Sequence, residues 1–296
     1  MDSQEYIKKI NLADRSVRVI SKDGLFRAVA VKNSASARTA QLNHGYPSKF
    51  ALSLAREMSF ASLLSAFLKG EERIIVQIDS ENTHLQRLYS EAMPIGEIRA
   101  FGICNKDVDD CNLSGSILRV SRILYGKTEP VFGIIQAKSS ELDDIFDEYM
   151  EQSEQIPSIV RTDAEVDSDG VVIESGGIIV QAMPGASEAD IRQVFDSVRN
   201  MKNFSEYLFM EMRPDQILKL ILPFSFDVLK SSRVDFFCRC SKEQFIYKLK
   251  LLGLKEIMQM KDGEQNELVC QFCNKHYRIE PEDFDKIIKE LEAKSN

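Results

Sequence analysis

The segments VDFFCRCS (residues 234–241) and ELVCQFCNKHY (residues 267–277) carry four cysteines that decide how the end of this chain folds. Their pattern is C-x-C, then 29 intervening residues, then C-x-x-C. Paired thiolates on two tight turns can each supply two adjacent vertices of the tetrahedron that zinc prefers. The spacing therefore predicts one zinc ion per chain, in the reduced protein, with the ligands Cys238, Cys240, Cys270 and Cys273.

The residues around the cysteines predict a small module over residues 233–296. Ser241 with Gln244 is a capping-box signal for a helix that follows the first knuckle. ELVCQFCNKHYRI is typical of a hairpin-like knuckle, and Pro281 suits the first turn of a last helix. His276 follows Cys273 by three residues, but four thiolates already complete the tetrahedron, so we expect it to pack beside the site.

Upstream of the module, residues 186–232 form an apolar segment that we predict to be a helical linker. Ser187 is a good helix N-cap, and apolar residues follow it at helical spacing. ILKLILPFSF (residues 217–226) is apolar nearly all round. Such a segment cannot be a solvated linker, so it must be buried against a domain or a partner.

Residues 1–185 alternate between strand and helix patterns, which gives an α+β fold with a mixed α/β N-terminal core domain. Asp23-Gly24 and Asp169-Gly170 are hairpin signals. The pattern predicts helices over residues 47–69 and 139–155, and strands over residues 73–79, 117–124 and 131–136.

The composition favours a soluble globular protein of the cytoplasm. Of the 296 residues, 44% are hydrophobic and 28% charged. The start, MDSQEYIKKI, carries charges where an export signal needs an apolar stretch, and no run approaches the roughly 18 apolar residues of a membrane span. The net charge of −8, with equal numbers of acidic and basic residues in the module, argues against binding nucleic acid or anionic membrane.

The remaining cysteines and histidines do not form a second predicted site. Cys104 and Cys111 flank an acidic run, and nearby carboxylates raise a thiol pKa, so we expect them to be structural or incidental. His44 and His84 have no partner identifiable from sequence. The common nucleotide-binding, metalloprotease and hydrolase motifs are missing from the sequence, so we expect no enzymatic activity.

Energies favour a site that switches. A module of this size has marginal stability, whereas structural zinc contributes roughly 10–16 kcal/mol in small zinc peptides. The nearest-neighbour disulfides would be Cys238–Cys240 and Cys270–Cys273, and each closes a loop worth only about 1.5–2 kcal/mol. Oxidation should therefore release the metal and unfold the module. If the module partly buries the apolar linker, its loss exposes a surface that binds unfolded clients or another copy of the chain.

At this point the residues match a known family. The chain resembles the redox-regulated heat-shock chaperones of about 33 kDa, which are zinc-containing bacterial holdases; its own mass is 33.7 kDa. FFCRCS followed by ELVCQFCNKHY is the most specific element. HGYP (residues 44–47), SEQIP (153–157) and GGIIVQ (176–181) agree in order, so the resemblance covers nearly the whole chain.

The resemblance implies an ATP-independent chaperone of the oxidative-stress response that is inactive when reduced and zinc-bound. Oxidation would form Cys238–Cys240 and Cys270–Cys273, release zinc, unfold the module and linker, and favour a homodimer. The expected partners are unfolded proteins. The expected client-binding residues lie in the apolar linker: Phe204, Tyr207, Leu208, Leu218, Ile221 and Phe224.

Two alternatives remain open. One is a zinc ribbon that docks proteins or nucleic acid, although ribbons favour two C-x-x-C pairs and the module is electrically neutral. The other is a thiol oxidoreductase that uses Cys270 and Cys273. Such catalytic pairs usually begin a helix, whereas here the sequence continues toward another strand.

Overall fold

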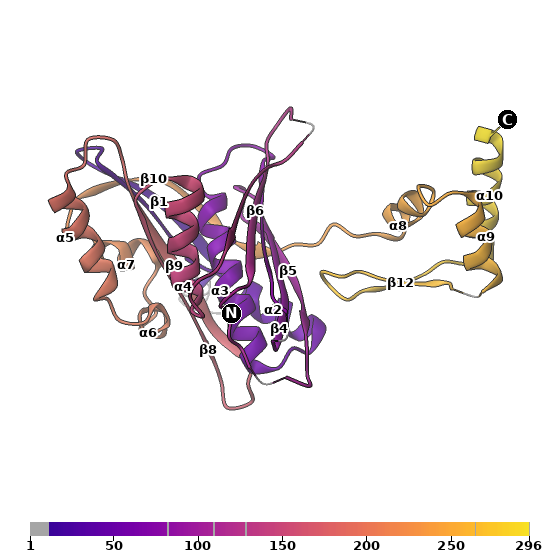
Figure 1. The fold of residues 1–296 in the computed structure, drawn as a ribbon, viewed down its shortest axis with the longest axis horizontal. Helices are drawn as coiled ribbons and strands as arrows, with labels where there is room; N and C mark the ends of the chain where they lie inside the picture. The colour runs from indigo at the N-terminus through magenta and orange to yellow at the C-terminus, as the bar shows by residue number, and fades with distance from the viewer. Residues whose placement is uncertain (1–11, 82, 109, 128, 264, 296) are drawn as a thin grey trace, which may run out of the picture. The chain divides into compact units, whose positions relative to one another are not determined.

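A computed structural model describes residues 12–295 apart from positions 82, 109, 128 and 264. The charged start MDSQEYIKKI and Asp109 of the acidic run lie outside the described residues. The chain forms two compact units, Met1–Phe237 and Cys238–Asn296 (Figure 1). The α+β prediction is confirmed. The three regions proposed from sequence thus occupy two units, because residues 186–237 pack as part of the first.

One antiparallel sheet of the first unit has the strand order β10-β1-β2-β9-β8. Its strands are β1 (Arg15–Ser21), β2 (Phe26–Lys32), β8 (Ser158–Val166), β9 (Val172–Ala182) and β10 (Phe226–Arg233). Gly24 and Gly170 take φ angles of 75° and 77° in the β1–β2 and β8–β9 turns. Both predicted hairpins are confirmed, because glycine adopts this left-handed backbone without a Cβ clash.

The other sheet has the order β11-β5-β4-β3-β6-β7. Its strands are β3 (Arg73–Asp79), β4 (Leu85–Ala92), β5 (Glu97–Cys104), β6 (Ile117–Ile123), β7 (Val131–Gln136) and β11 (Asp235–Phe236). The predictions of β3, β6 and β7 are confirmed. β11 pairs parallel with the start of β5, so the chain leaves the first unit along this sheet's edge.

Helices α2 (Ser34–His44), α3 (Ser48–Ser65) and α4 (Leu142–Tyr149) belong to the first unit, and α4 runs on into a π-helical turn, η1 (Met150–Glu154). The α3 helix is buried on almost every side and shares one apolar core with residues of both sheets, such as Val29, Ile74 and Ile179. The predicted helices over 47–69 and 139–155 are confirmed.

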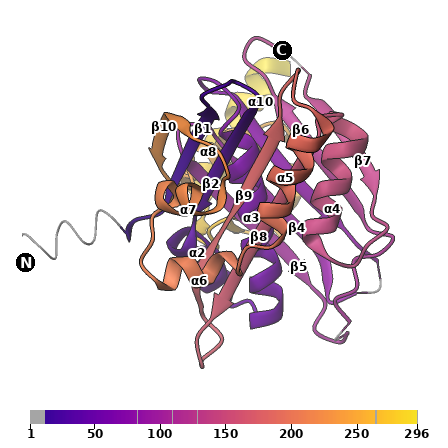
Figure 2. The ribbon, with the colours of Figure 1, turned by 90° about the vertical axis from the view of Figure 1, so that its left-hand side faces the viewer.

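The apolar linker packs on the opposite face of the first sheet (Figure 2). It forms α5 (Glu188–Arg199), α6 (Phe204–Phe209) and α7 (Pro214–Ile221), followed by strand β10. Its apolar side chains share a second core with Val17, Phe26 and Ile178 of the sheet. The prediction that this segment must be buried is confirmed, and every member of the cluster belongs to the first unit.

Two expectations for the linker need correction. Residues 186–232 are not helical throughout, because Phe226–Arg233 pairs as an antiparallel strand with β1. The apolar side chains also do not need the C-terminal module to bury them, since alternate residues of β1, β2 and β9 present a ready apolar face.

The second unit contains α8 (Lys242–Leu249), α9 (Leu254–Asp262), β12 (Glu267–Val269), β13 (His276–Arg278) and α10 (Pro281–Ser295). The Ser241 hydroxyl accepts a hydrogen bond of 3.2 Å from the Gln244 amide, which confirms the predicted cap. Pro281 begins α10 as predicted. The apolar core cluster of this unit contains Leu249, Ile257, Ile279, Phe284 and Ile287. No helix among the described residues combines the length and apolar character needed to cross a membrane.

Candidate metal centre

Two knuckles of the second unit carry the predicted ligands. Cys238 and Cys240 lie between β11 and α8, while Cys270 and Cys273 lie in the turn between β12 and β13. In that turn the Cys270 amide donates to the Lys275 carbonyl at 2.9 Å, and the Asn274 amide donates to the Cys270 carbonyl at 2.8 Å. The C-x-x-C pair thus sits in a β-knuckle and not at the start of a helix, where a catalytic thiol pair would gain from the helix dipole.

The four sulfur atoms converge. All Sγ atoms of Cys238, Cys240, Cys270 and Cys273 lie within 4.8 Å of one another. The Cys238–Cys270 and Cys240–Cys273 sulfurs are 3.6 and 3.3 Å apart, and all four cysteines are free thiols. Zn–S bonds of about 2.3 Å in a tetrahedron place sulfurs roughly 3.8 Å apart, whereas a disulfide needs about 2.05 Å. The donor set therefore fits a single thiophilic metal ion.

The pKa shifts of three of these thiols are also consistent with a site for a metal cation. At Cys240 burial opposes ionisation, but side-chain hydrogen bonding with Tyr277 and with the neighbouring thiols outweighs it and lowers the pKa to about 7. Burial raises the pKa of Cys238 and of Cys273, and hydrogen bonding of these thiols to Cys240 raises it further. One thiolate forms readily and its neighbours then resist ionisation, so a bound cation would favour full deprotonation of the set.

Tyr277 is a residue of this site that the sequence reasoning missed. Its hydroxyl lies 3.2 Å from the Cys240 sulfur and donates to the Cys240 carbonyl at 3.0 Å. The ring comes from β13, so it fastens the C-x-C knuckle to the C-x-x-C hairpin. The signal available in the sequence was the tyrosine four residues after Cys273, on the strand that leaves the knuckle.

The other histidines and cysteines have local roles. His276 is exposed, and its Nδ1 lies 2.9 Å from a Glu267 carboxylate oxygen across the hairpin, so the structure places it outside the sulfur cluster. His84 Nε2 lies 3.4 Å from the Cys104 sulfur. Burial is the largest cause that raises the pKa of Cys104; the sequence argument had attributed such a rise to carboxylates. His44 stacks on Tyr46.

The predicted client-binding residues belong to the linker, and most of them face the first sheet instead of the surface. Five of the six are buried in the core between the helices and the first sheet: Phe204, Tyr207, Leu208, Leu218 and Ile221. Phe224 is half-buried and stacks on Phe26 with ring centroids 5.4 Å apart. These side chains can meet another protein only after the linker has left the sheet.

Known proteins are similar to this chain over most of its length. The family model described as Hsp33 protein matches residues 14–280. The 33 kDa chaperonin of Bacillus subtilis (strain 168) is 31% identical, over 92% of this chain and 97% of its own length. The 33 kDa chaperonin of Citrifermentans bemidjiense is 30% identical, over 95% and 98%. The crystal structure of the 33 kDa chaperonin from Thermotoga maritima has a similar fold, with a TM-score of 0.81, 23% identity, and coverage of 94% of this chain and 98% of that one.

Proposed function

The chain belongs to the Hsp33 family, and from that membership we propose that it is a redox-regulated molecular chaperone that holds unfolded proteins without ATP. The observation that carries the proposal is the convergence of four sulfurs within 4.8 Å in a unit with a small apolar core. In the reduced state the chaperone is inactive. Oxidation activates it, and it protects unfolded proteins of the cytoplasm from aggregation.

In the reduced state Cys238, Cys240, Cys270 and Cys273 hold one zinc ion. Four thiolates favour zinc over calcium and magnesium, which prefer oxygen ligands. When bound, the ion neutralises the cluster and ties the C-x-C knuckle to the β12–β13 hairpin. Tyr277 holds the Cys240 knuckle in position through its hydrogen bond to the backbone.

An oxidant such as hydrogen peroxide converts the four sulfurs to the disulfides Cys238–Cys240 and Cys270–Cys273. For each disulfide, two thiolates lose two electrons and form one S–S bond. The O–O bond of one peroxide breaks, and with two protons it leaves as two water molecules. A sulfur in a disulfide no longer carries the charge that binds a metal ion, so the zinc ion dissociates.

Loss of the metal unfolds the second unit. Structural zinc contributes roughly 10–16 kcal/mol in zinc peptides, and each short disulfide returns only about 1.5–2 kcal/mol. Each disulfide would lie within its own knuckle, so neither would join the C-x-C knuckle to the C-x-x-C hairpin. The apolar core of Leu249, Ile257, Ile279, Phe284 and Ile287 is too small to compensate.

Client binding requires a second event in the first unit. The apolar residues of α6 and α7 are packed on the first sheet, so unfolding of the second unit must be followed by release of residues 186–232. Release uncovers Phe204, Leu208 and Leu218 together with the sheet face beneath them. This apolar surface binds unfolded clients, and between two copies it supports the oxidised homodimer.

The test compares reduced and peroxide-treated protein in a client-aggregation assay, while a chromogenic chelator follows zinc. We expect about one zinc per chain to be released together with the gain of activity. The variant Cys240→Ser should bind zinc poorly. The control Cys104→Ser/Cys111→Ser changes thiols outside the cluster and should switch normally. Equal activity of the reduced and oxidised protein would refute the switch.

A further inference from the structure

Strand β10 differs from the other strands of its sheet in how it is held. None of its residues, Phe226–Arg233, is buried, and Val228 and Leu229 are each about half exposed. The opposite edge strand, β8, buries Ile159, Val160 and Ala164. β8 is thus anchored by several buried side chains, whereas in β10 only the partly buried Phe226, its first residue, packs against an apolar core.

The attachment of β10 to β1 is mainly a ladder of backbone hydrogen bonds. The antiparallel pairing runs from Arg15 opposite Arg233 to Ser21 opposite Phe226, with a bulge near Arg18. The ladder continues at both ends: the Lys22 amide donates to the Ser225 carbonyl, and the Val234 amide donates to the Asp14 carbonyl, each at 3.0 Å.

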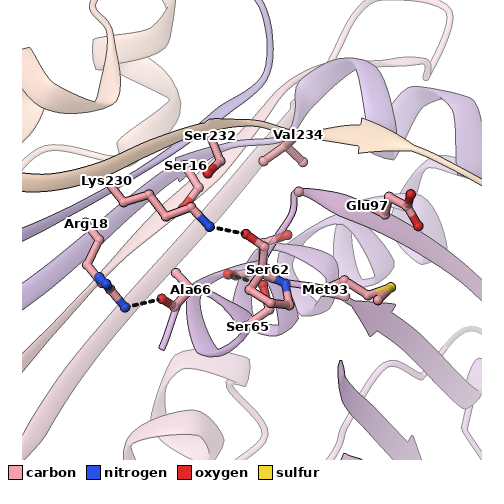
Figure 3. Close-up of a pocket in the computed structure, with 13 residues that line it drawn as sticks. Ser16, Arg18, Ser62, Ser65, Ala66, Met93, Glu97, Lys230, Ser232 and Val234 are labelled. Carbon is pink, nitrogen blue, oxygen red and sulfur yellow. Dashed lines mark hydrogen bonds between the residues drawn. The ribbon is translucent and has the colours of Figure 1, made fainter. Parts of the chain in front are cut away.

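Besides the packing of Phe226, two polar side chains tie β10 to the rest of the unit: Arg233 pairs with Asp235 at 2.8 Å, and Lys230 contacts the turn between β4 and β5. Lys230 Nζ reaches the Pro94 carbonyl at 2.7 Å (Figure 3). Beside it lies a cavity of about 20 Å³, lined by hydroxyls such as those of Ser16, Ser62 and Ser232. This volume is about that of one water site, so the packing beneath this part of β10 is incomplete.

Because the β1 edge recognises β10 through backbone groups, it accepts an extended chain of almost any sequence. We propose that β1 (Arg15–Ser21), once β10 has left, is a strand-addition site for extended segments of unfolded client proteins. The inference deepens the proposed function and rests on it, since β10 must first be released. Such a site explains how one surface can serve unrelated clients: backbone pairing gives affinity without reading the sequence.

The β1 edge lies next to an apolar face, which suits the apolar side chains of an unfolded client. The ladder adjoins the apolar face that α5–α7 cover, and Phe226 at the end of β10 packs against that same cluster. A client strand in place of β10 would therefore lay some of its own apolar side chains beside the uncovered face. Strand β7 (Val131–Gln136) is also an edge, but no strand covers it in the described sheet, so its availability cannot depend on the linker.

Hydrogen–deuterium exchange on the full-length protein tests the site. β1 also pairs with β2, so only alternate amides of residues 15–21 face β10. We expect those amides to be protected in the reduced form, to exchange faster after oxidation, and to regain protection when an unfolded client such as denatured citrate synthase is added. The amides of β7 serve as the internal control and should not respond to the client. This pattern would localise the client on the β1 edge.

Other outcomes overturn the inference in distinguishable ways. A client that binds while residues 15–21 remain exposed, or while β10 never leaves, places the binding elsewhere and leaves the proposed function intact. Protection that returns before any client is added and grows with protein concentration identifies a second copy as the occupant. Oxidised protein that binds no client refutes the proposed function and the inference with it.

A competition experiment separates backbone pairing from apolar binding. A synthetic peptide of residues 225–234 should displace client from the oxidised protein, and so should a peptide with the same residues in scrambled order. The same peptide N-methylated at alternate residues keeps its side chains but loses backbone donors. We expect it to compete at least about tenfold more weakly. Equal competition by the methylated peptide would sink the strand-addition site.

Discussion

The two units of this chain solve the problem of stability in different ways. The first unit encloses two apolar cores, one around α3 and one under the linker, with fully buried aromatic residues such as Phe50, Phe60 and Phe204. The second unit buries a handful of apolar side chains and gathers four sulfurs beside them. Apolar cores respond weakly to redox chemistry, whereas a thiolate cluster responds strongly. The first unit is therefore held by its apolar cores, whereas the second would depend on a metal ion bound by its sulfurs.

The largest expected effect is on removal of the metal. A strong chelator applied to the reduced protein should unfold the second unit, because the roughly 10–16 kcal/mol that structural zinc contributes in small zinc peptides exceeds what the core of this unit can supply. Helical circular dichroism should fall by the share of α8–α10, while amides of α3 keep their protection. Retention of helical signal and exchange protection in residues 238–295 after zinc loss would break the comparison, since the second unit would then be stable by its core alone.

Truncation of a first-unit aromatic should produce the opposite pattern. Phe60 is fully buried and stacks on Phe146 with ring centroids 4.0 Å apart. Phe60→Ala should destabilise the first unit by about 3–5 kcal/mol through lost burial and a cavity. Urea unfolding of the reduced protein measures the loss, and zinc content should remain that of the wild type. The exposed Tyr125 provides the control, since Tyr125→Ala should change the unfolding free energy by less than about 0.5 kcal/mol.

The first unit should have a pH dependence of its own. Burial raises the pKa of Asp14 from 3.8 to about 6, although the Ser36 and Ala35 amides donate to its carboxylate. A raised folded-state pKa gives a contribution that is complete below about pH 4 and is lost as the pH rises through about 6. Between pH 4 and 7 the wild type should therefore lose up to about 3 kcal/mol relative to Asp14→Asn, whose side chain does not titrate. A constant difference across that range in urea titrations would contradict the shift.

Gly96 lies against the backbone at the end of β10. Its φ is +96°, and a Cβ built there would lie 1.7 Å from the Arg233 carbonyl oxygen, so the strand that leaves β10 passes directly over it. Gly96→Ala should push residues 233–235 away and cost about 1–3 kcal/mol. We expect faster exchange of β10 amides and partial chaperone activity in the reduced, zinc-loaded protein.

The matched control for that variant is Gly126→Ala. Gly126 also has a positive φ, 73°, but an added Cβ meets no atom within 4 Å. It carries the backbone strain without the clash. If both variants release β10 equally, the close approach at Gly96 is not what fastens the strand, and the linker is held by its apolar core alone.

Local signals in the sequence predicted local structure well. The Asp-Gly turns, the serine caps at Ser187 and Ser241 and the proline that begins α10 all fall where their backbone chemistry places them. The metal centre was equally accessible, because cysteine spacing on tight turns is a local property. What spacing could not give is the Tyr277 contact, which depends on how the β12–β13 hairpin closes on the other knuckle.

Features that depend on distant parts of the chain were missed. The α2 helix buries Ser36, Ala37, Ala40 and Gln41, so its inner face is not an apolar stripe. Strand β10 has no buried residue and owes its conformation to β1 at the other end of the chain. The linker was correctly read as buried, but which surface buries it is a tertiary fact, and that surface decides whether zinc loss alone can expose it.

The smallest expected effects come from removing a serine N-cap, an interaction that occurs once in each unit. The hydroxyls of Ser187 and Ser241 cap α5 and α8, and each accepts a 3.2 Å hydrogen bond from the amide three residues on. Replacing either serine with alanine should cost about 1 kcal/mol. In the first unit Ser187→Ala should lower the urea midpoint whether or not zinc is present. In the second unit folding and metal binding are one equilibrium, so Ser241→Ala should appear as about fivefold weaker zinc retention in chelator competition. A Ser241→Ala variant that retains zinc as tightly as the wild type would mean that α8 folds independently of the cluster, and the second unit would then resemble the first more than its small core suggests.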